Sequence, residues 1–171
     1  MKINKVVDAN GRIKYECVGA KMIWMNFSGK EGRYNPEGRR NFNLLLDKDS
    51  AEYLKNEGFN VKFHEARNEG EDGIYTLKVN VNFKGYKPPE IWMKNNHGNT
   101  HLNEDSVNVL DWANIEELYV TFNPYAYQDS RTAYLDKLLA TVHESEYESM
   151  FFDEEDSAAN TMTFQAIKSE D

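Results

Sequence analysis

Disulfides, membrane spans and secretion signals are all missing from this chain. Its 171 residues include a single cysteine, Cys17, so no disulfide can form within the chain and a reducing compartment is expected. No apolar run approaches the roughly 20 residues that a membrane span needs, and the N-terminus has no apolar stretch of the signal-peptide kind. These absences predict a cytoplasmic protein that does not bind a membrane.

Enzyme motifs are missing as well. The chain contains no Gly-Lys-Ser/Thr phosphate loop, no Gly-x-Ser-x-Gly elbow and no His-Glu-x-x-His motif. His97 and His101 are followed by Glu104 and Asp105, but Gly98 and the neighbouring asparagines favour a turn over a metal site. We therefore expect no catalytic residue, no metal and no cofactor, and predict that the protein is not an enzyme. The sequence leaves open a carboxylate site assembled from distant residues.

The chain has fewer cations than acids, and the excess of acids lies in its last 28 residues. The chain holds 20 Lys and Arg against 29 Asp and Glu, a net charge of −9. Residues 1–143 contain 19 of the cations and 20 of the acids, whereas residues 144–171 contain nine acids and one lysine. We predict one domain over residues 1–143, followed by an acidic and flexible tail over residues 144–171.

A near-neutral body with an acidic end suits a protein that binds a polyanion, because the end can compete for the same groove or recruit partners. Within the tail, one methionine and two phenylalanines stand among acids, and we interpret this segment as a partner-binding anchor. The residues expected to bind partners are Met150, Phe151, Phe152, Asp153, Glu154 and Glu155. Because the chain continues through residues 161–168, the sequence leaves open which part of the tail meets a partner.

The apolar pattern of the body predicts a mainly β fold. From Tyr75 to Phe83, apolar residues alternate with polar ones, which is typical of a strand with one buried face. Further strands are predicted over residues 19–27, 40–46, 59–63, 90–94, 117–123 and 131–142. One helix is predicted over residues 50–57, with Asp49 or Ser50 as N-cap and Gly58 as C-cap, and a second short helix near residues 104–110. This pattern favours an OB-fold-like Greek-key barrel with one or two short helices and a hairpin decoration.

A basic and aromatic segment follows the first predicted strand. Residues 21–42 carry five cations against two acids, with aromatic rings interleaved. Cations that follow phosphates, and rings on which any base can stack, are the two components of sequence-tolerant single-strand binding. We expect Phe27 and Phe42 in the core and Tyr34, in mid-loop, at the binding surface. The residues predicted here to bind nucleic acid are Lys21, Trp24, Lys30, Arg33, Tyr34, Arg39 and Arg40.

A second basic and aromatic cluster spans residues 84–94. If Ile91 and Met93 face the core, Trp92 points outward, where it can stack a base, cover a barrel edge or meet another subunit. The residues predicted here to bind nucleic acid are Lys84, Tyr86, Lys87, Trp92 and Lys94. A weaker set of tyrosines, Tyr119, Tyr125 and Tyr127, could extend the same surface.

These residues resemble a known family. The run Asn26–Glu31, then Tyr34-Asn35, Gly38–Phe42 and Lys87-Pro88-Pro89, together with the acidic end, is similar to the single-stranded DNA-binding proteins of tailed bacteriophages, particularly phages of Gram-positive hosts. The resemblance covers residues 19–143 and the character of the tail. It implies an OB-fold core, binding of single-stranded DNA (ssDNA) without sequence preference, and location in the host cytoplasm.

The resemblance also implies roles for particular segments. The protein would protect ssDNA during phage DNA replication and recombination, and its acidic tail would recruit replication or recombination proteins. By position, the cations Lys30, Arg33, Arg39 and Arg40 would lie on a strand-connecting loop that flanks the binding groove.

Two other functions remain open at the level of sequence. A DNA-mimicking inhibitor of a host nuclease or defence system would use the acidity, but it predicts acids on the folded surface, whereas here they concentrate in the tail. An interaction module would use its exposed aromatics to meet protein. Homo-oligomerisation is also left open.

Overall fold

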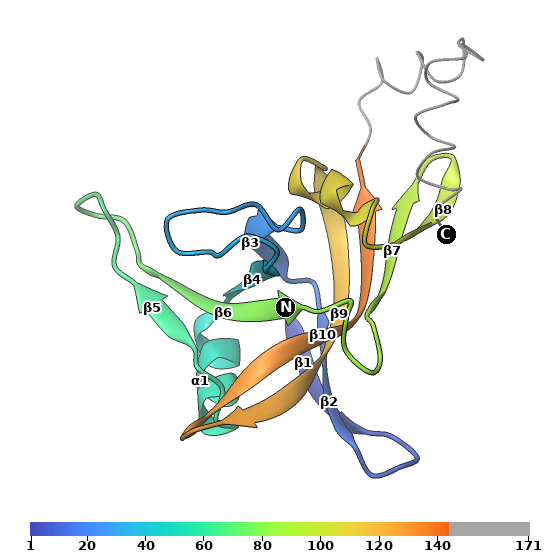
Figure 1. Cartoon of the computed structure of the whole chain (residues 1–171). Coiled ribbons are helices and arrows are strands. Elements are labelled where there is room, and N and C mark those ends of the chain that lie inside the picture. Colours follow the sequence, from blue (N-terminus) through green and yellow to red (C-terminus); the bar gives the residue numbers. More distant parts are fainter. Residues whose placement is uncertain (144–171) are drawn as a thin grey trace.

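The computed structural model describes residues 1–143 (Figure 1). The strands are β1 (Lys2–Val7), β2 (Ile13–Val18), β3 (Lys21–Asn26), β4 (Arg40–Leu46), β5 (Lys62–His64), β6 (Ile74–Val81), β7 (Glu90–Asn95), β8 (Gly98–Leu102), β9 (Ile115–Tyr127) and β10 (Ser130–Val142). The helices are α1 (Lys48–Asn56) and the short 3-10 helix η1 (Val107–Asp111). Among these residues, no helix has the length and apolarity of a membrane span. The predicted tail and its partner-binding residues lie outside the described part of the chain.

Five strands form a curled sheet in the order β9-β10-β6-β4-β3. Neighbours are antiparallel except for β6 and β10, which pair in parallel at Val79↔Ala133 and Asn80↔Tyr134. The curl brings β3 back into contact with β9. The Gly19 N–H, between β2 and β3, donates to the Leu118 carbonyl of β9 at 3.2 Å and continues the pairing of β2 with β9. This order, with one parallel pair and a return to the first strand, is that of an OB-like, partly open Greek-key barrel. The predicted fold class is confirmed.

The barrel core is built from alternating residues of these strands. On β6, Leu77, Val79 and Val81 are buried, as the alternation in the sequence predicted. Phe27 and Phe42 are fully buried and stack with ring centroids 5.3 Å apart, which confirms their expected place in the core. Phe59, just after α1, packs edge-on against other core rings and so ties this helix to the barrel.

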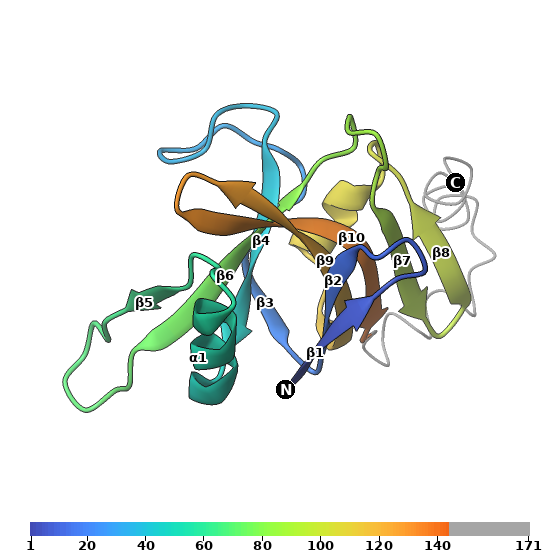
Figure 2. The same cartoon turned by 90° about the horizontal axis from the view of Figure 1, so that it is seen from below.

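β10 is long enough to belong to two parts of the sheet. Its first half pairs with β6, and after a register shift between Leu135 and Lys137 its second half pairs in parallel with β7. The β7–β8 hairpin therefore decorates the barrel, as predicted, and Figure 2 shows it at the opposite end of the molecule from α1 and β5. A second hairpin, β1–β2, adds to the free edge of β9.

Several element boundaries differ from the predictions. β1 and β2 were not predicted. β1 is an exposed edge strand without a clear period of two, whereas β2 does alternate, with Tyr15 and Cys17 buried. The segment from residue 97 to 101, interpreted as a turn, is a turn only at its start and continues as β8. β5 covers only Lys62–His64, because the preceding Phe59 turns into the core.

The helices also differ in their boundaries. The N-cap of α1 is Asp47, whose carboxylate accepts from the Ser50 N–H at 2.7 Å, and not the predicted Asp49 or Ser50. The C-cap is Glu57, and Gly58 follows it with a φ of +92°, a conformation that glycine adopts without strain. The second predicted helix is the 3-10 turn η1 and begins three residues later than expected.

Candidate nucleic-acid interface

A cleft of about 630 Å³ lies on the outward face of β4 and β6. Figure 1 shows the β3–β4 loop and the tip of the β9–β10 hairpin on opposite sides of β6, and both contribute residues to the cleft. We call this the main cleft. It is lined by Trp24, Arg39, Asn43, Asn60, Lys62, His64, Thr76, Leu77, Lys78, Asn80, Tyr127, Arg131, Thr132, Ala133 and Tyr134.

The main cleft is cationic although the chain is acidic. Four cations reach it from four different elements: Arg39 from the β3–β4 loop, Lys62 from β5, Lys78 from β6 and Arg131 from β10. Among the described residues, no Asp or Glu lines it. Three asparagine amides, which can both donate and accept, lie between the cations. The cleft therefore attracts a polyanion and offers adaptable polar groups along its floor.

Trp24 forms one wall of the main cleft because the backbone of β3 is irregular there. The pairing of β3 with β4 shifts register between Ile23 and Asn26, and Trp24 has a φ of +48°, which L-residues rarely adopt. The indole is 54% exposed, and its ring stands edge-on to the His64 ring with centroids 4.9 Å apart. His64 is in turn held by the Thr76 hydroxyl at 3.1 Å. Strain of this kind is frequent at functional sites, where it fixes the direction of a side chain.

Tyrosines of the β9–β10 hairpin form the opposite wall. Tyr127 is 60% exposed at the tip, and the Tyr125 ring packs edge-on against Tyr134 with centroids 5.8 Å apart. The Arg131 guanidinium is held by a core residue, because its Nη1 donates to the hydroxyl of the buried Tyr15 at 3.0 Å. That hydroxyl donates to Glu57 at 3.0 Å. Burial and the bond to Glu57 raise the pKa of Tyr15 to about 12. In its protonated form this hydroxyl accepts from Arg131 and donates to Glu57 at the same time.

The β3–β4 loop, residues 27–39, is braced by two asparagines and one aspartate. The Asn26 side chain bonds both the N–H and the carbonyl of Lys30, each at 3.0 Å. The Asn35 amide donates to the carbonyls of three loop residues. The Asp111 carboxylate accepts from the N–H groups of Phe27 and Ser28 at 2.7 and 3.1 Å. The loop therefore presents its cations from a fixed backbone.

Only some of the binding residues predicted within residues 21–42 lie at the main cleft. Trp24 and Arg39 line the main cleft. Lys30, Arg33 and Tyr34 are exposed on the β3–β4 loop beside it, with the Arg33 guanidinium 5.4 Å from the centre of the Tyr34 ring. Lys21 lies elsewhere, in a separate hollow beside Glu116 and Glu117.

Arg40 is directed into the protein. Its Nη1 donates to the Phe27 carbonyl at 2.5 Å, and its guanidinium lies 5.4 Å from the centre of the Phe83 ring. Its Nη2 is 3.9 Å from a Glu104 carboxylate oxygen. The guanidinium thus joins the base of the β3–β4 loop to the two loops that follow β6 and β8.

The second predicted cluster lies outside the main cleft. Lys84, Tyr86 and Lys87 are exposed on the β6–β7 loop, and Tyr86 is fully exposed. Ile91 and Met93 of β7 are buried and Trp92 lies on the opposite face, as predicted, but Trp92 is half-buried rather than exposed. Lys94 is exposed. The Trp92 indole donates to Glu90 at 2.9 Å and packs against the His101 ring with centroids 4.9 Å apart.

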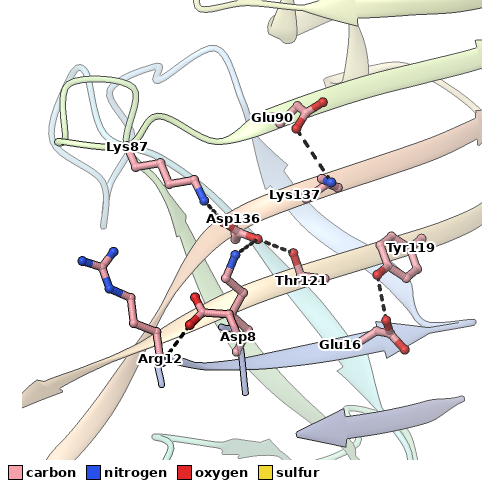
Figure 3. Close-up of polar contacts among 10 residues, drawn as sticks. Asp8, Arg12, Glu16, Lys87, Glu90, Tyr119, Thr121, Asp136 and Lys137 are labelled. Atoms are coloured by element: carbon pink, nitrogen blue, oxygen red, sulfur yellow. Dashed lines mark hydrogen bonds and ion pairs between the residues drawn. The ribbon is translucent and has the colours of Figure 1, made fainter. Parts of the chain in front are cut away.

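Lys87 belongs to a charge network centred on Asp136 (Figure 3). At the bulge of β10, the Asp136 carboxylate accepts from the Thr121 hydroxyl at 2.8 Å and from Lys14 at 3.1 Å, and Lys87 lies 3.7 Å away. Burial by itself raises the pKa of a carboxyl, but these bonds and the charges of Lys14 and Lys87 outweigh it, so the pKa of Asp136 is lowered. The network sets two lysines against one carboxylate, and it holds β2, β9 and β10 together.

Most residues that line the main cleft were not predicted from the sequence, among them the cations Lys62, Lys78 and Arg131 and the ring of Tyr134. A signal was present for Lys78, which lies on the polar face of the alternating segment 75–83. That face was interpreted only as solvated, and it forms the cleft floor. The place of Arg131 and Tyr134 in the cleft depends on the parallel pairing of β10 with β6, and no local sequence pattern indicates that pairing.

Comparisons with known proteins identify a family and a similar fold. A family model described as "Putative phage ssDNA-binding domain" matches residues 9–171. Among solved structures, the chain is similar to the single-stranded DNA-binding protein from bacteriophage Enc34 in complex with ssDNA, with a TM-score of 0.53 and 10% identity over 83% of this chain and 92% of that chain. The structure described as the single-stranded DNA-binding protein from bacteriophage Enc34 gives a TM-score of 0.49 and 9% identity over 85% and 92%. No curated protein matches the chain in sequence.

Proposed function

Since the chain belongs to the phage ssDNA-binding domain family, we propose that it binds ssDNA without sequence preference in the main cleft. The observation that carries this proposal is the lining of the cleft, in which four cations and three aromatic rings meet without a carboxylate among the described residues. Cations attract phosphates of any sequence, and rings stack on any base. The face of the second and third barrel strands, with the loops on either side, is also where OB-folds bind oligonucleotides.

The same lining favours single strands over duplex. Stacking on Trp24 and Tyr127 requires bases that are not already stacked and paired. Four cations give too little charge to hold a duplex by phosphate contacts alone, whereas stacking adds about 1–3 kcal/mol for each base. We expect the difference in affinity between the two forms to come mainly from these rings.

Fluorescence anisotropy with a labelled oligo-dT and with the matching duplex tests the proposal. Each phosphate contact to a single strand contributes about −0.7 to the slope of log affinity against log salt, so about 3 to 5 contacts predict a slope of about −2 to −3.5. Tight, salt-dependent binding of oligo-dT and weak binding of duplex are the expected results. Equal affinity for duplex, or affinity that does not change with salt, contradicts the proposal.

We propose further that the protein protects ssDNA in the host cytoplasm during phage DNA replication and recombination. In this proposal, the segment Met150–Glu155 recruits the replication or recombination proteins. The support is the charge of residues 144–171, in which nine acids accompany one lysine and frame a short apolar cluster. Pull-down of replication proteins from infected host cells, with the full chain and with a chain ending at His143, tests this role. Equal recovery by both chains contradicts it.

We also propose that the protein acts by binding alone. Cys17 is fully buried, and burial raises its pKa to about 12, so it is protected from acting as a nucleophile. Within residues 1–143, no three His, Cys, Asp or Glu side chains are grouped closely enough to hold a metal ion. Incubation with labelled ssDNA and divalent metal is expected to leave the strand intact, and cleavage would contradict the proposal.

A further inference from the structure

A second hollow lies beyond Trp24, on the side away from the floor of the main cleft. It has a volume of about 420 Å³ and lies between β3, the first residues of the β3–β4 loop and the end of η1. Its chemistry comes mainly from Trp24, Lys30 and Trp112. Because Trp24 lines both hollows, they meet at this side chain. We call the second hollow the Trp112 hollow.

Trp112 is an exposed ring on a rigid support. Its side chain is 69% exposed, although it directly follows η1, whose Val107 and Leu110 are fully buried. The preceding Asp111 is fixed by the N–H groups of Phe27 and Ser28. A large indole held in water by an anchored backbone is organised in advance for a flat partner, and its immobilisation costs little conformational entropy.

Lys30 supplies the charge that accompanies this ring. Its ammonium nitrogen lies 5.6 Å from the centre of the Trp112 ring, within the range of a cation–π contact. Its backbone is held on both sides by the Asn26 side chain, which directs the lysine toward the hollow. Two carboxylates also line the hollow, but Asp111 is already occupied by two backbone N–H groups, which leaves Glu31 as the other acid.

The two hollows follow each other across the sheet. Strand pairing places β6 beside β4 and β4 beside β3, and Asp111 ties the end of η1 to the residues that follow β3. A strand of DNA that crosses β6 and β4 in the main cleft therefore reaches Trp24 and then Trp112. We propose that Trp112 and Lys30 form a second ssDNA subsite, in which the indole stacks a base and the ammonium binds a phosphate. This inference rests on the proposed function and extends the bound strand past the main cleft.

Oligo-dT of graded length, from about 4 to about 16 nucleotides, separates the two hollows. Short strands fill the main cleft, and longer strands reach Trp112. We expect Trp112→Ala to raise the Kd of the longest strand by about 5- to 150-fold, since one stacked base contributes about 1–3 kcal/mol, and to leave the Kd of the shortest unchanged. Lys30→Ala should reduce the magnitude of the salt slope by about 0.7 for long strands only.

Two control variants distinguish loss of base stacking at Trp112 from a general effect of removing a ring. Trp112→Phe retains a stacking ring and should keep most of the affinity for long strands. Tyr53→Ala removes a partly exposed ring on α1 that lines neither hollow, and it should change no Kd. Urea unfolding of each variant confirms that the fold is intact.

Tryptophan fluorescence gives an independent measurement. The chain has three tryptophans, so Trp24→Phe with Trp92→Phe leaves Trp112 as the only emitter. We expect long oligo-dT to quench this emission and short oligo-dT to leave it unchanged. Unchanged affinity in Trp112→Ala at every length, equal losses for short and long strands, or absence of quenching each overturns the second subsite. If wild-type protein binds no oligo-dT, the proposed function itself fails.

Discussion

Trp24 combines an exposed indole with a backbone angle that favours glycine. The left-handed conformation costs an L-residue about 1–2 kcal/mol, which glycine does not pay. Glycine loses about 0.5–1 kcal/mol relative to alanine through its freedom in the unfolded chain. We therefore expect Trp24→Gly to be more stable than Trp24→Ala, by up to about 1 kcal/mol in urea unfolding. If Trp24→Gly were instead less stable than Trp24→Ala by about 0.5–1 kcal/mol, the φ of +48° would carry no strain in solution.

The same pair of variants separates stability from binding. Both lack the ring, so both should lose about 1–3 kcal/mol of ssDNA affinity in anisotropy titrations. Trp24→Phe serves as the control, since it keeps a stacking surface. If Trp24→Gly retained full affinity, the indole would have no part in the interface.

Lys78 and Lys21 form a matched pair of exposed lysines. Lys78 lines the main cleft, whereas Lys21 lies in a separate hollow beside two glutamates. We expect Lys78→Ala to weaken oligo-dT binding and to reduce the magnitude of the salt slope by about 0.7, because one phosphate contact is lost. Lys21→Ala should leave both the affinity and the slope unchanged. The reverse result would place the strand on another face of the sheet.

Arg40 is expected to behave differently from both lysines. Its guanidinium is engaged by Phe27, Phe83 and Glu104. We infer a structural role, so that Arg40→Ala lowers the urea midpoint while the salt slope of the folded protein is retained.

At the scale of elements, the bulge in β10 places the Asp136 carboxylate where it joins three strands of the sheet. Asp136 has a side chain only 9% exposed, and its pKa is lowered. A lowered folded-state pKa means that the unfolded chain binds the proton more readily, so the stabilisation is present above the ordinary Asp pKa of about 3.9 and is lost as the pH falls through the folded value. We expect Asp136→Asn to lower the free energy of unfolding at pH 7 by about 1.5–3 kcal/mol.

Urea titrations between pH 7 and pH 3 check this expectation. The difference between wild type and Asp136→Asn should shrink as the pH falls below about 4. Thr121→Val, which removes one neutral donor to the same carboxylate, should cost less at pH 7. A difference that stays constant with pH would mean that folding does not change the pKa of this carboxyl.

Local patterns in the sequence were sufficient for the central strands and for part of the site. The prediction of residues 40–46 coincides with β4, and the alternation over residues 75–83 identified the buried face of β6. Trp24 and Arg39 were selected because they stand in a basic and aromatic segment. β1 left no local signal because it is exposed and has no clear period of two. The parallel pairing that brings Arg131 into the cleft left none because it joins segments that are distant in the sequence.

At the scale of the whole molecule, the charges of the cleft and of residues 144–171 are opposite. We expect a chain ending at His143 to bind ssDNA more tightly than the full chain if the acidic segment competes for the main cleft. The effect should be large at 0.01 M salt, where the Debye length is about 30 Å, and small near 1 M. Anisotropy titrations at both salt concentrations, with urea midpoints as the test of folding, measure it.

A control of equal length replaces the nine acids of residues 144–171 by Asn and Gln. It should bind ssDNA as tightly as the shortened chain, because charge and not length causes the competition. If the shortened chain binds more weakly at low salt, the acidic segment supports the interface, and the competition model is wrong.

The parallel contact between β6 and β10 also has a consequence for synthesis. Among the strands of residues 1–143, β10 is the last to leave the ribosome, and it pairs with β6 and carries Arg131 and Tyr134 into the cleft. Contacts between segments so far apart form late, because the intervening chain must be ordered first. We therefore expect a chain interrupted before β10 to lack the complete cleft and to compete poorly with finished protein for DNA. Its core strands would be exposed, which would make it a substrate for the proteases of the cell.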